Sequence, residues 1–202
     1  MPGPSHSSAY RFLAEALLYP EDRDTQKLEA LAAEAGAACP HWRDTLESLL
    51  ASPELGSCDT YLESFEIGAK APLYLGHYLF EEPNNCRGAA ICGRNGYMIQ
   101  LKNLYRHFGL ELQAGELPDF LPMMLEFLAL TAEHPDQKRR RWMIKHYILP
   151  ALSALGRALG KLNNVYSPLA DILPHLVNEE LAEPSDPQPQ GMTAAAELQD
   201  AT

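Results

Sequence analysis

Residues 109–131 read GLELQAGELPDFLPMMLEFLALT, and this stretch does more than any other to decide the fold. Its second half, Phe120 to Leu130, is an apolar run with the character of a helix. The four residues Glu116 to Asp119 stand directly before it. Proline is tolerated in the first turn of a helix, and a carboxylate near the start favours the helix dipole. The stretch therefore predicts a helix that begins near Pro118.

Apolar residues at helical spacing also mark the chain before this stretch. Pro72 is expected to kink the longest of the predicted helices, because a proline inside a helix removes a hydrogen bond. Residues 81–95 are rich in turn formers and predict no regular element. The expected helices are Tyr10 to Leu18, ended by Tyr19-Pro20; about Asp24 to Gly36; Pro40 to Ser52-Pro53; an Asp59 N-cap to about Leu79; and Gly96 to Phe108, with Gly109 as the C′ residue.

Helical spacing continues to the end of the folded part. Pro135 starts a stretch that Pro150 should kink, and Ser167-Pro168 is typical of the start of a last helix to about Glu180. No run of alternating β-branched residues indicates a strand. The sequence predicts an all-α, single-domain helical bundle over residues 1–182. From Pro184 the composition shifts to Pro, Gln, Ala and Ser, so residues 183–202 are expected to form a disordered tail.

The charge balance limits the possible partners. The formal net charge is -11, which disfavours nucleic acid because phosphate binding needs concentrated Lys and Arg. The one basic cluster, Lys138 to Arg141, is expected to be a solvated helix face, with a contact site as the alternative. No apolar run is long enough to cross a membrane, and no secretory signal is recognisable at the N-terminus. We therefore expect a cytoplasmic protein that does not insert into membranes.

Motifs for catalysis or cofactor binding are missing from the sequence. It lacks the glycine-rich phosphate loops, the H-E-x-x-H zinc pattern and the G-x-S-x-G nucleophile elbow, so no enzyme, cofactor or metal site is predicted. The four cysteines form no C-x-x-C pair and are expected to be free thiols in a reducing compartment. The alternative is a small metal-binding protein that uses Cys86, Cys92 and His77.

Three groups of residues, in order, carry a family resemblance. Together they resemble the TorD/DmsD/NarJ-type maturation chaperones of molybdenum enzymes, nearest the nitrate-reductase delta-subunit branch. The resemblance covers roughly Asp59 to Leu181. The groups are Tyr61-x-x-x-Phe65-x-x-Gly68 with Leu73-Tyr74-Leu75-x-His77; Arg94, Met98, Leu101, Tyr105 and Gly109-Leu110; and Glu116-Leu117-Pro118-Asp119 with Leu121-Pro122 and Leu125-Glu126.

Two departures from the family pattern stand out. Phe120 occupies a position where many relatives have histidine, so any role of that histidine does not transfer. The segment between His77 and Arg94 is longer than in nitrate-reductase chaperones. This length suggests a subgroup serving a related enzyme of the DMSO-reductase family.

The resemblance implies an all-helical, TorD-like fold and a dedicated chaperone function. Such proteins bind the immature (apo) catalytic subunit of a molybdenum oxidoreductase in the cytoplasm, often through its N-terminal segment or twin-arginine leader. They hold it until the molybdenum cofactor is inserted, and then release it. No particular oligomeric state is implied. The alternative is a permanent structural subunit of an oxidoreductase complex.

An acidic protein with an aromatic-lined groove could hold both the arginines and the apolar helix of a leader peptide. The bland interpretation assigns the aromatic residues and Met123 to the core, the two acidic residues before the apolar run to a helix cap, and His77 to a buried position. The candidates for client-peptide binding are Tyr61, Phe65, Tyr74 and His77 from one helix, and Glu116, Asp119, Phe120, Met123 and Glu126 from the following loop and helix.

Overall fold

A computed structural model describes residues 4–80, 93–112 and 115–182, and within these ranges it contains helices and no strand. The all-α prediction is confirmed. The α-helices are α1 (Pro4–Ala16), α2 (Thr25–Ala38), α3 (Arg43–Ala51), α4 (Cys58–Phe65), α5 (Gly76–Leu79), α7 (Gly93–His107), α8 (Leu121–Leu130), α9 (Gln137–Met143), α10 (Leu149–Leu159) and α11 (Leu169–Ala182). Short 3₁₀ turns η1 (Pro20–Asp22), η2 (Pro40–Trp42) and η3 (Pro53–Gly56) and the π-helical turn η4 (Ile144–Ile148) join them.

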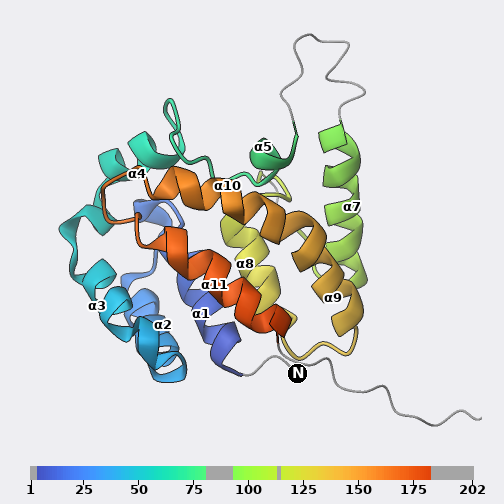
Figure 1. The fold of residues 1–202 in the computed structure, drawn as a ribbon, viewed down its shortest axis with the longest axis horizontal. Coiled ribbons are helices and arrows are strands. Elements are labelled where there is room, and N and C mark those ends of the chain that lie inside the picture. Colours follow the sequence, from blue (N-terminus) through green and yellow to red (C-terminus); the bar gives the residue numbers. More distant parts are fainter. Residues whose placement is uncertain (1–3, 81–92, 113–114, 183–202) are drawn as a thin grey trace, which may run out of the picture.

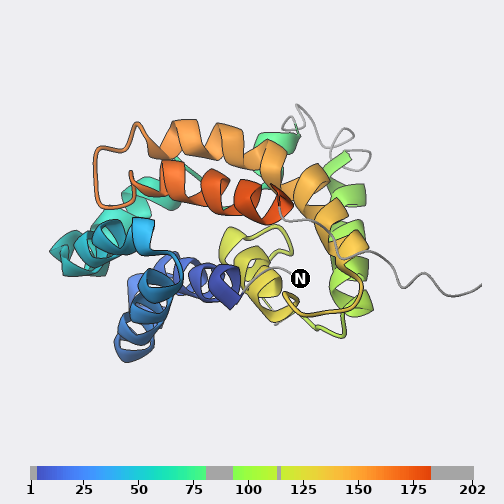
Figure 2. The same ribbon diagram turned by 60° about the horizontal axis from the view of Figure 1, so that its bottom comes forward.

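The helices form two layers (Figures 1 and 2). In one layer, α1 packs against α2 and α8. In the other, α10 and α11 lie side by side in antiparallel directions, and α11 also contacts α1. Helices α2 and α3 stand at one end of the molecule, and α7 and α9 at the other (Figure 1). The core fills the space between the two layers.

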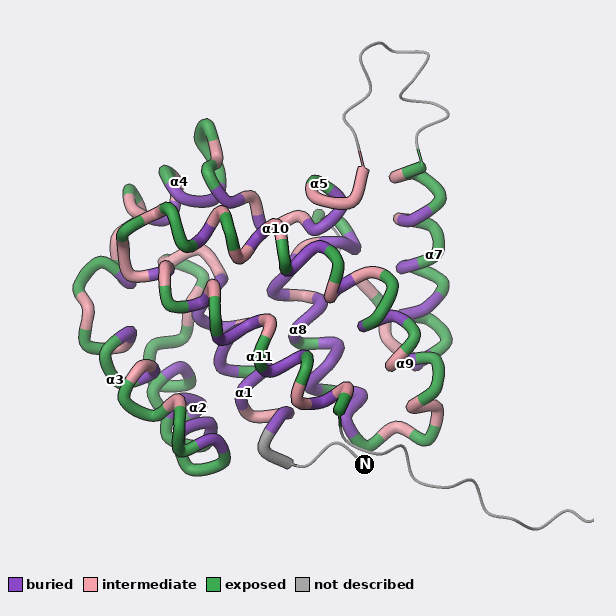
Figure 3. The backbone as a smooth tube through the Cα atoms, viewed as in Figure 1, coloured by how far each residue is buried: buried purple, intermediate pink, exposed green. Residues whose placement is uncertain are grey.

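The core is built from the apolar stripes that the sequence predicts. Tyr10 and Leu13 of α1 and Leu17 directly after it are buried, and so is the series Ile144, Ile148, Leu152, Leu155 and Leu159. Figure 3 shows these buried segments facing the middle of the molecule, with exposed residues on the outer faces. Helical spacing thus decides which residues are covered.

The helix predicted from Asp59 to Leu79 is wrong. Helix α4 ends at Phe65, and its N-cap is Ser57, whose side chain accepts a hydrogen bond from the Thr60 amide at 3.2 Å. Gly68 then adopts a positive φ of 61°, a conformation that suits glycine and turns the chain. Pro72 consequently lies in a non-helical segment and kinks nothing.

The segment after Pro72 runs extended because it pairs with the residues before α8. The Leu75 amide donates to Asp119 O at 2.9 Å, and the Leu121 amide donates to Leu73 O at 2.8 Å. These two bonds frame an antiparallel bridge between Tyr74 and Phe120. Two segments far apart in the sequence therefore meet beside the start of α8.

The structure also differs from the expectations for Pro118 and Pro150. Helix α8 begins at Leu121, with Pro122 and not Pro118 in its first turn. Pro150 lies in the first turn of α10, directly after the π-helical turn η4, so the irregularity at this proline is a local change of pitch. Gly109 closes α7 with a φ of 74°, as expected for a C′ glycine.

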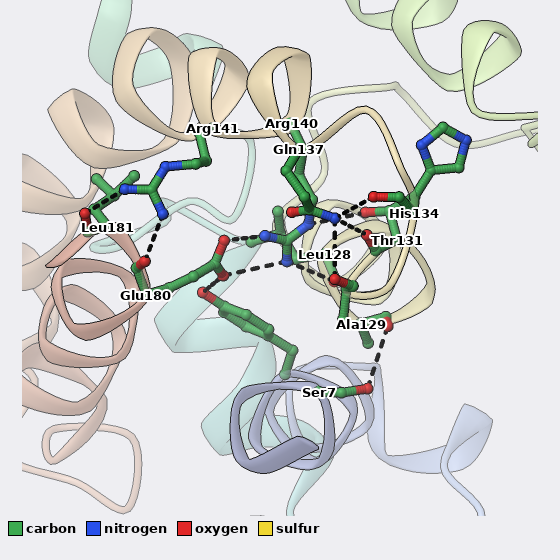
Figure 4. Close-up of polar contacts among 12 residues, drawn as sticks. Ser7, Leu128, Ala129, Thr131, His134, Gln137, Arg140, Arg141, Glu180 and Leu181 are labelled. Carbon is green, nitrogen blue, oxygen red and sulfur yellow. Dashed lines mark hydrogen bonds and ion pairs between the residues drawn. The ribbon is translucent and has the colours of Figure 1, made fainter. Parts of the chain in front are cut away.

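Arg140 overturns the prediction that the basic cluster is a solvated face. Its side chain is completely buried and forms an ion pair with Glu180 of α11 (Figure 4). It also donates to Leu128 O at 2.7 Å and to Thr131 Oγ1 at 3.1 Å, and Tyr10 Oη donates to Glu180 at 2.7 Å. This network, which we call the Arg140 clamp, joins α1, α8, α9 and α11. Lys138 and Arg139 are exposed, as predicted.

Two further expectations concern residues that the structure does not describe. The tail predicted for residues 183–202 and the cysteines Cys86 and Cys92 lie outside the described residues. Of the described cysteines, Cys58 is a free thiol, as expected, and Cys39 is buried. No helix in the described ranges is both long and apolar enough to span a bilayer.

Candidate functional site

A groove of about 680 Å³ lies between α1, α2 and α8, beside the connection that follows α7. This volume is in the range of ordinary ligand pockets. Helix α8 and the residue before it supply much of the lining, and this is the segment that the sequence marks most strongly. The lining residues are Arg11, Ala14, Glu15, Leu18, Lys27, Leu31, Tyr105, Leu110, Glu111, Leu112, Glu116, Phe120, Pro122, Met123, Glu126, Phe127, Ala129 and Leu130.

Part of the groove wall is apolar and reachable from solvent. Phe120 and Met123 are half-buried, and Leu130 keeps 55% of its surface exposed. An exposed leucine alone needs no explanation, but here it continues a line of apolar side chains along α8. These three side chains can contact the apolar face of a ligand.

The rim of the groove is acidic. Its lining contains four carboxylates, Glu15, Glu111, Glu116 and Glu126, and two cations, Arg11 and Lys27. The buried Glu15 is already paired with Lys27 at 2.7 Å. This hydrogen bond raises the pKa of Lys27, and Glu126 adds to the effect. Apart from this pair, the rim has three exposed carboxylates and one arginine. Its net negative charge favours a cationic ligand.

Tyr74 lies beside one corner of the groove and contacts two of its lining residues, Phe120 and Glu116. The rings of Tyr74 and Phe120 are 5.3 Å apart between centroids, and the Tyr74 hydroxyl donates to Glu116 at 3.4 Å. Burial and the nearby Glu116 carboxylate raise the pKa of Tyr74 to about 12, so its hydroxyl remains a donor at neutral pH. The extended segment therefore supports Phe120 and Glu116 from outside the groove lining.

Asp119 holds the segment that carries Phe120 in place from inside the protein. It is fully buried, and its Oδ2 accepts from the Gly76 amide at 2.9 Å and from Arg94 Nη2 at 3.1 Å. The carbonyl of the preceding Pro118 accepts from Tyr105 Oη at 2.7 Å. No side-chain cap bonds the start of α8, so the interpretation of Asp119 as a helix cap is wrong. Asp119 positions the segment and does not line the groove.

The structure divides the predicted site residues into those at the groove and those elsewhere. Four line the groove (Glu116, Phe120, Met123 and Glu126), and Tyr74 contacts two of these. Tyr61 and Phe65 are each 2% exposed and pack on one another and on Tyr166, which confirms the core interpretation for them. His77 is exposed on α5 and outside the groove lining, so its predicted buried position is wrong.

The sequence interpretation missed the wall formed by α1 and α2. Arg11, Ala14 and Leu18 recur at helical spacing beside the buried stripe of Tyr10, Leu13 and Leu17. This second, mixed stripe was the available signal, because a helix covered on one face and lining a groove on the next shows two adjacent stripes.

A second cavity, of about 650 Å³, lies between α7 and α9 and includes His107, Asp136 and Trp142 in its lining. His107 Nε2 is 2.8 Å from Asp136 Oδ2. Partial burial alone would raise the pKa of Asp136, but hydrogen bonds from the Arg139 amide and His107 bring it below its ordinary value. His107, Asp136 and Arg139 are already paired with one another, which makes this cavity a weaker candidate than the groove.

Known proteins resemble this chain over most of its length. The sequence pattern of a family described as nitrate reductase delta subunit matches residues 28–168. The Escherichia coli K12 protein named nitrate reductase molybdenum cofactor assembly chaperone NarJ is 30% identical over 162 residues, which are 75% of this chain and 63% of NarJ. NarW of the same strain, provisionally given the same role, is 30% identical over 146 residues, which are 72% of this chain and 58% of NarW.

Two more comparisons extend this picture. The nitrate reductase-like protein NarX of Mycobacterium tuberculosis H37Rv is 29% identical over 71% of this chain, which is only 20% of NarX. The chain thus spans about three fifths of NarJ and NarW and one fifth of NarX. A crystal structure from Archaeoglobus fulgidus, provisionally described as a redox enzyme maturation protein, superposes with a TM-score of 0.55 at 17% identity and covers 85% of this chain and 93% of that one. The fold is therefore shared with that protein.

Proposed function

Because the chain belongs to the nitrate reductase delta subunit family, we propose that it is an assembly chaperone for a molybdenum oxidoreductase. In this proposal it binds the immature catalytic subunit in the cytoplasm, keeps it competent for insertion of the molybdenum cofactor, and releases it afterwards. The role is binding without catalysis. The names of NarJ and NarW, as molybdenum cofactor assembly chaperones, support it.

The groove is the single observation that carries this proposal. Its apolar wall of Phe120, Met123 and Leu130 lies beside a rim with three exposed carboxylates that form no ion pair among the described residues. An amphipathic helix with basic residues complements such a surface: its apolar anchors would contact the wall, and its arginines would pair with Glu116 and Glu126. One side of the groove is built from the segment that carries the family resemblance, and α1 and α2 supply the other.

We propose that the occupant is the N-terminal segment of the client, which can include a twin-arginine leader. A leader offers adjacent guanidinium groups and an apolar helical stretch, and both features match the groove. The structural role of Asp119 fits this assignment, because a buried anchor keeps Phe120 and Glu116 in fixed positions. That the client is an enzyme other than nitrate reductase stays a prediction. It depends on the long segment between His77 and Arg94, and most of that segment lies outside the described residues.

A pull-down from the native cytoplasm tests this function. Tagged protein is recovered, and the bound proteins are identified by mass spectrometry together with their molybdenum content. The proposal predicts a molybdenum-enzyme catalytic subunit that lacks its full cofactor. Recovery of a complete, cofactor-loaded enzyme would favour the permanent structural subunit instead, and recovery of neither would contradict both roles.

A further inference from the structure

We propose that His41, His175 and Glu179 form a binding site for a divalent transition-metal ion of the zinc class. None of these residues lines the groove, and the site is independent of the proposed chaperone function. One nitrogen or oxygen atom from each of the three lies within 4.8 Å of the others. In the described part of the chain, no other group of three His, Cys, Asp or Glu side chains meets this condition.

Two of the ligands come from one face of α11. His175 and Glu179 are four residues apart, so their side chains are neighbours on the helix surface, and His175 Nε2 is 3.0 Å from Glu179 Oε1. The third ligand, His41, belongs to the 3₁₀ turn η2, and its Nε2 is 4.0 Å from the same carboxylate oxygen. Two imidazoles therefore converge on one carboxylate from two separate elements.

The donor set suits zinc and its neighbours in the first transition series. Zinc binds imidazole nitrogen and carboxylate oxygen at about 2.0–2.2 Å, and many sites use three protein ligands with a fourth position left to water. Tetrahedral coordination at such bond lengths places donor atoms roughly 3.3 Å apart. The two histidine nitrogens lie 3.0 Å and 4.0 Å from the Glu179 oxygen, and all the ligand atoms lie within 4.8 Å of one another, so the spacings are near the value that a tetrahedral site needs.

Trp42 supports the two imidazoles from the protein side. Its ring centroid is 4.9 Å from that of His41 and 5.2 Å from that of His175, and the two imidazoles are 5.6 Å apart. Trp42 also lines a small apolar crevice with Cys39 and Leu176. An apolar shell on one side and solvent on the other is a usual environment for a metal site, because the shell fixes ligand orientation while the ion enters from water.

A neutral imidazole offers a lone pair on its ring nitrogen, and this is the form of histidine that metals bind. The three side chains are between 38% and 51% exposed, so a metal ion can reach them from solvent.

The ion would link the 3₁₀ turn η2, which precedes α3, to α11. Ligands that bind only the folded state stabilise it in proportion to the logarithm of their concentration over Kd. We therefore expect Zn²⁺ at a hundredfold excess over its Kd to raise the Tm by about 5 °C or more.

Titration of the metal-free full-length chain with Zn²⁺ in a calorimeter tests the site. The expected result is one ion per chain. The affinity for Zn²⁺ should fall more than about 100-fold in His175→Ala and in Glu179→Gln, which is a larger loss than substitution of a residue that only hydrogen-bonds a metal ligand causes. His146→Ala is the matched control, since His146 is exposed and outside the cluster. It should leave both affinity and Tm shift unchanged.

Two results would overturn the inference. One is Zn²⁺ binding by His175→Ala within twofold of the natural chain, provided that its metal-free Tm shows an intact fold. The other is a Co²⁺ complex whose spectrum is dominated by thiolate charge-transfer bands, which would assign the ion to cysteines. A Co²⁺ spectrum of nitrogen and oxygen ligands that disappears in His41→Ala supports the proposed site.

Discussion

Asp119 shows how one buried carboxylate can position a surface that it does not form. It accepts hydrogen bonds from the Gly76 amide and from Arg94, and it thereby holds the segment that presents Tyr74 and Phe120 to the groove. The contact requires a very close approach of backbone to carboxylate. A Cβ added at Gly76 would stand 2.5 Å from Asp119 Oδ2 and 2.9 Å from Arg94 Nε.

Gly76→Ala should therefore destabilise the fold. Overpacking of a filled site costs about 1–3 kcal/mol, and here it would also displace the Asp119 contact. Urea unfolding measures the change. Gly96→Ala is the matched control: Gly96 lies inside α7 with open space around it, so alanine there should stabilise by about 0.5–1 kcal/mol. Equal effects of the two substitutions would refute the close packing at Gly76.

Two buried tyrosines offer a contrasting pair. Tyr105 Oη donates to Pro118 O at 2.7 Å, whereas the buried Tyr97 hydroxyl has no hydrogen-bond partner among the described residues. Tyr97→Phe should be neutral or stabilising because it removes an unsatisfied polar group, and Tyr105→Phe should cost about 1–3 kcal/mol because it leaves a buried carbonyl unpaired. Denaturant midpoints of both variants decide this. A larger loss in Tyr97→Phe than in Tyr105→Phe would contradict the assignment.

At this scale the sequence predicts residue types better than their roles. Glu116 and Phe120 were predicted to bind the client, and both line the groove. Asp119 was predicted to bind the client beside them, but it is buried. Its burial could not be predicted, because its partners, Gly76 and Arg94, are distant in sequence and no local pattern indicates them. Tyr61 and Phe65 share helical spacing with any core residue, so spacing alone could not separate groove from core.

Among the elements, α9 and α11 are joined by the Arg140 clamp. The Arg140 guanidinium is fully buried and bonds Glu180, Leu128 O and Thr131 (Figure 4). Arg141 adds a bond of 2.9 Å to Glu180 O near the C-terminus of α11, where a cation also meets the negative end of the helix dipole. The clamp therefore fixes how the two layers of helices pack against each other.

Arg140→Met should destabilise the protein strongly. It leaves Glu180 as a buried charge without its cation, and breaking such a pair costs about 3–5 kcal/mol. Arg139→Met, on the same helix but exposed, is the control and should change stability by less than about 0.5 kcal/mol. In the double variant Arg140→Met/Glu180→Met the loss should be smaller than the sum of the single losses, and strict additivity would argue against the clamp.

Elements with local signals were predictable, and elements defined by distant partners were not. The buried stripes of α1 and α10 followed from spacing, and Gly109 from its place after α7. The segment after Phe65 was predicted as helix but is extended, since its hydrogen bonds go to residues 119 and 121. The four basic residues of α9 look alike in sequence, and only the position of Glu180 on α11 selects Arg140 for burial.

For the molecule as a whole, tyrosine burial sets a limit at high pH. Burial raises the pKa of Tyr61, Tyr97 and Tyr105 above the ordinary value near 10. These hydroxyls bind protons more tightly in the folded state than in the unfolded state. Their contribution to the free energy of unfolding is therefore fully present below about pH 10 and is lost as the pH rises above it.

Urea unfolding at pH 8, 9, 10 and 11 checks this dependence. The midpoint should hold between pH 8 and 9 and fall between pH 10 and 11, and the fall should be shallower in Tyr97→Phe. A constant midpoint up to pH 11 would show that these hydroxyls titrate normally in the folded protein.

The groove is a property of the whole fold, because it needs α1 and α2 as well as the segment of the family resemblance. The acidic character of the chain, with a net charge of -11, predicted a cationic partner, and the rim of Glu111, Glu116 and Glu126 gives that prediction a location. The opposing wall from α1 and α2 could not be placed from sequence, since nothing in Arg11 or Lys27 indicates which helices will meet.

Binding of the client's N-terminal peptide, measured by fluorescence anisotropy on the natural chain and three variants, tests the central claim most directly. Leu130→Glu and Glu126→Lys alter the apolar wall and the acidic rim, and each should weaken binding more than about tenfold, or 1.4 kcal/mol. Ile99→Glu is the control, because Ile99 is as exposed as Leu130 (59% against 55%) and lies on α7 outside the groove. It should bind within twofold of the natural chain. Unchanged affinity in both groove variants, or equal losses in all three, would contradict the assignment of the groove as the client site.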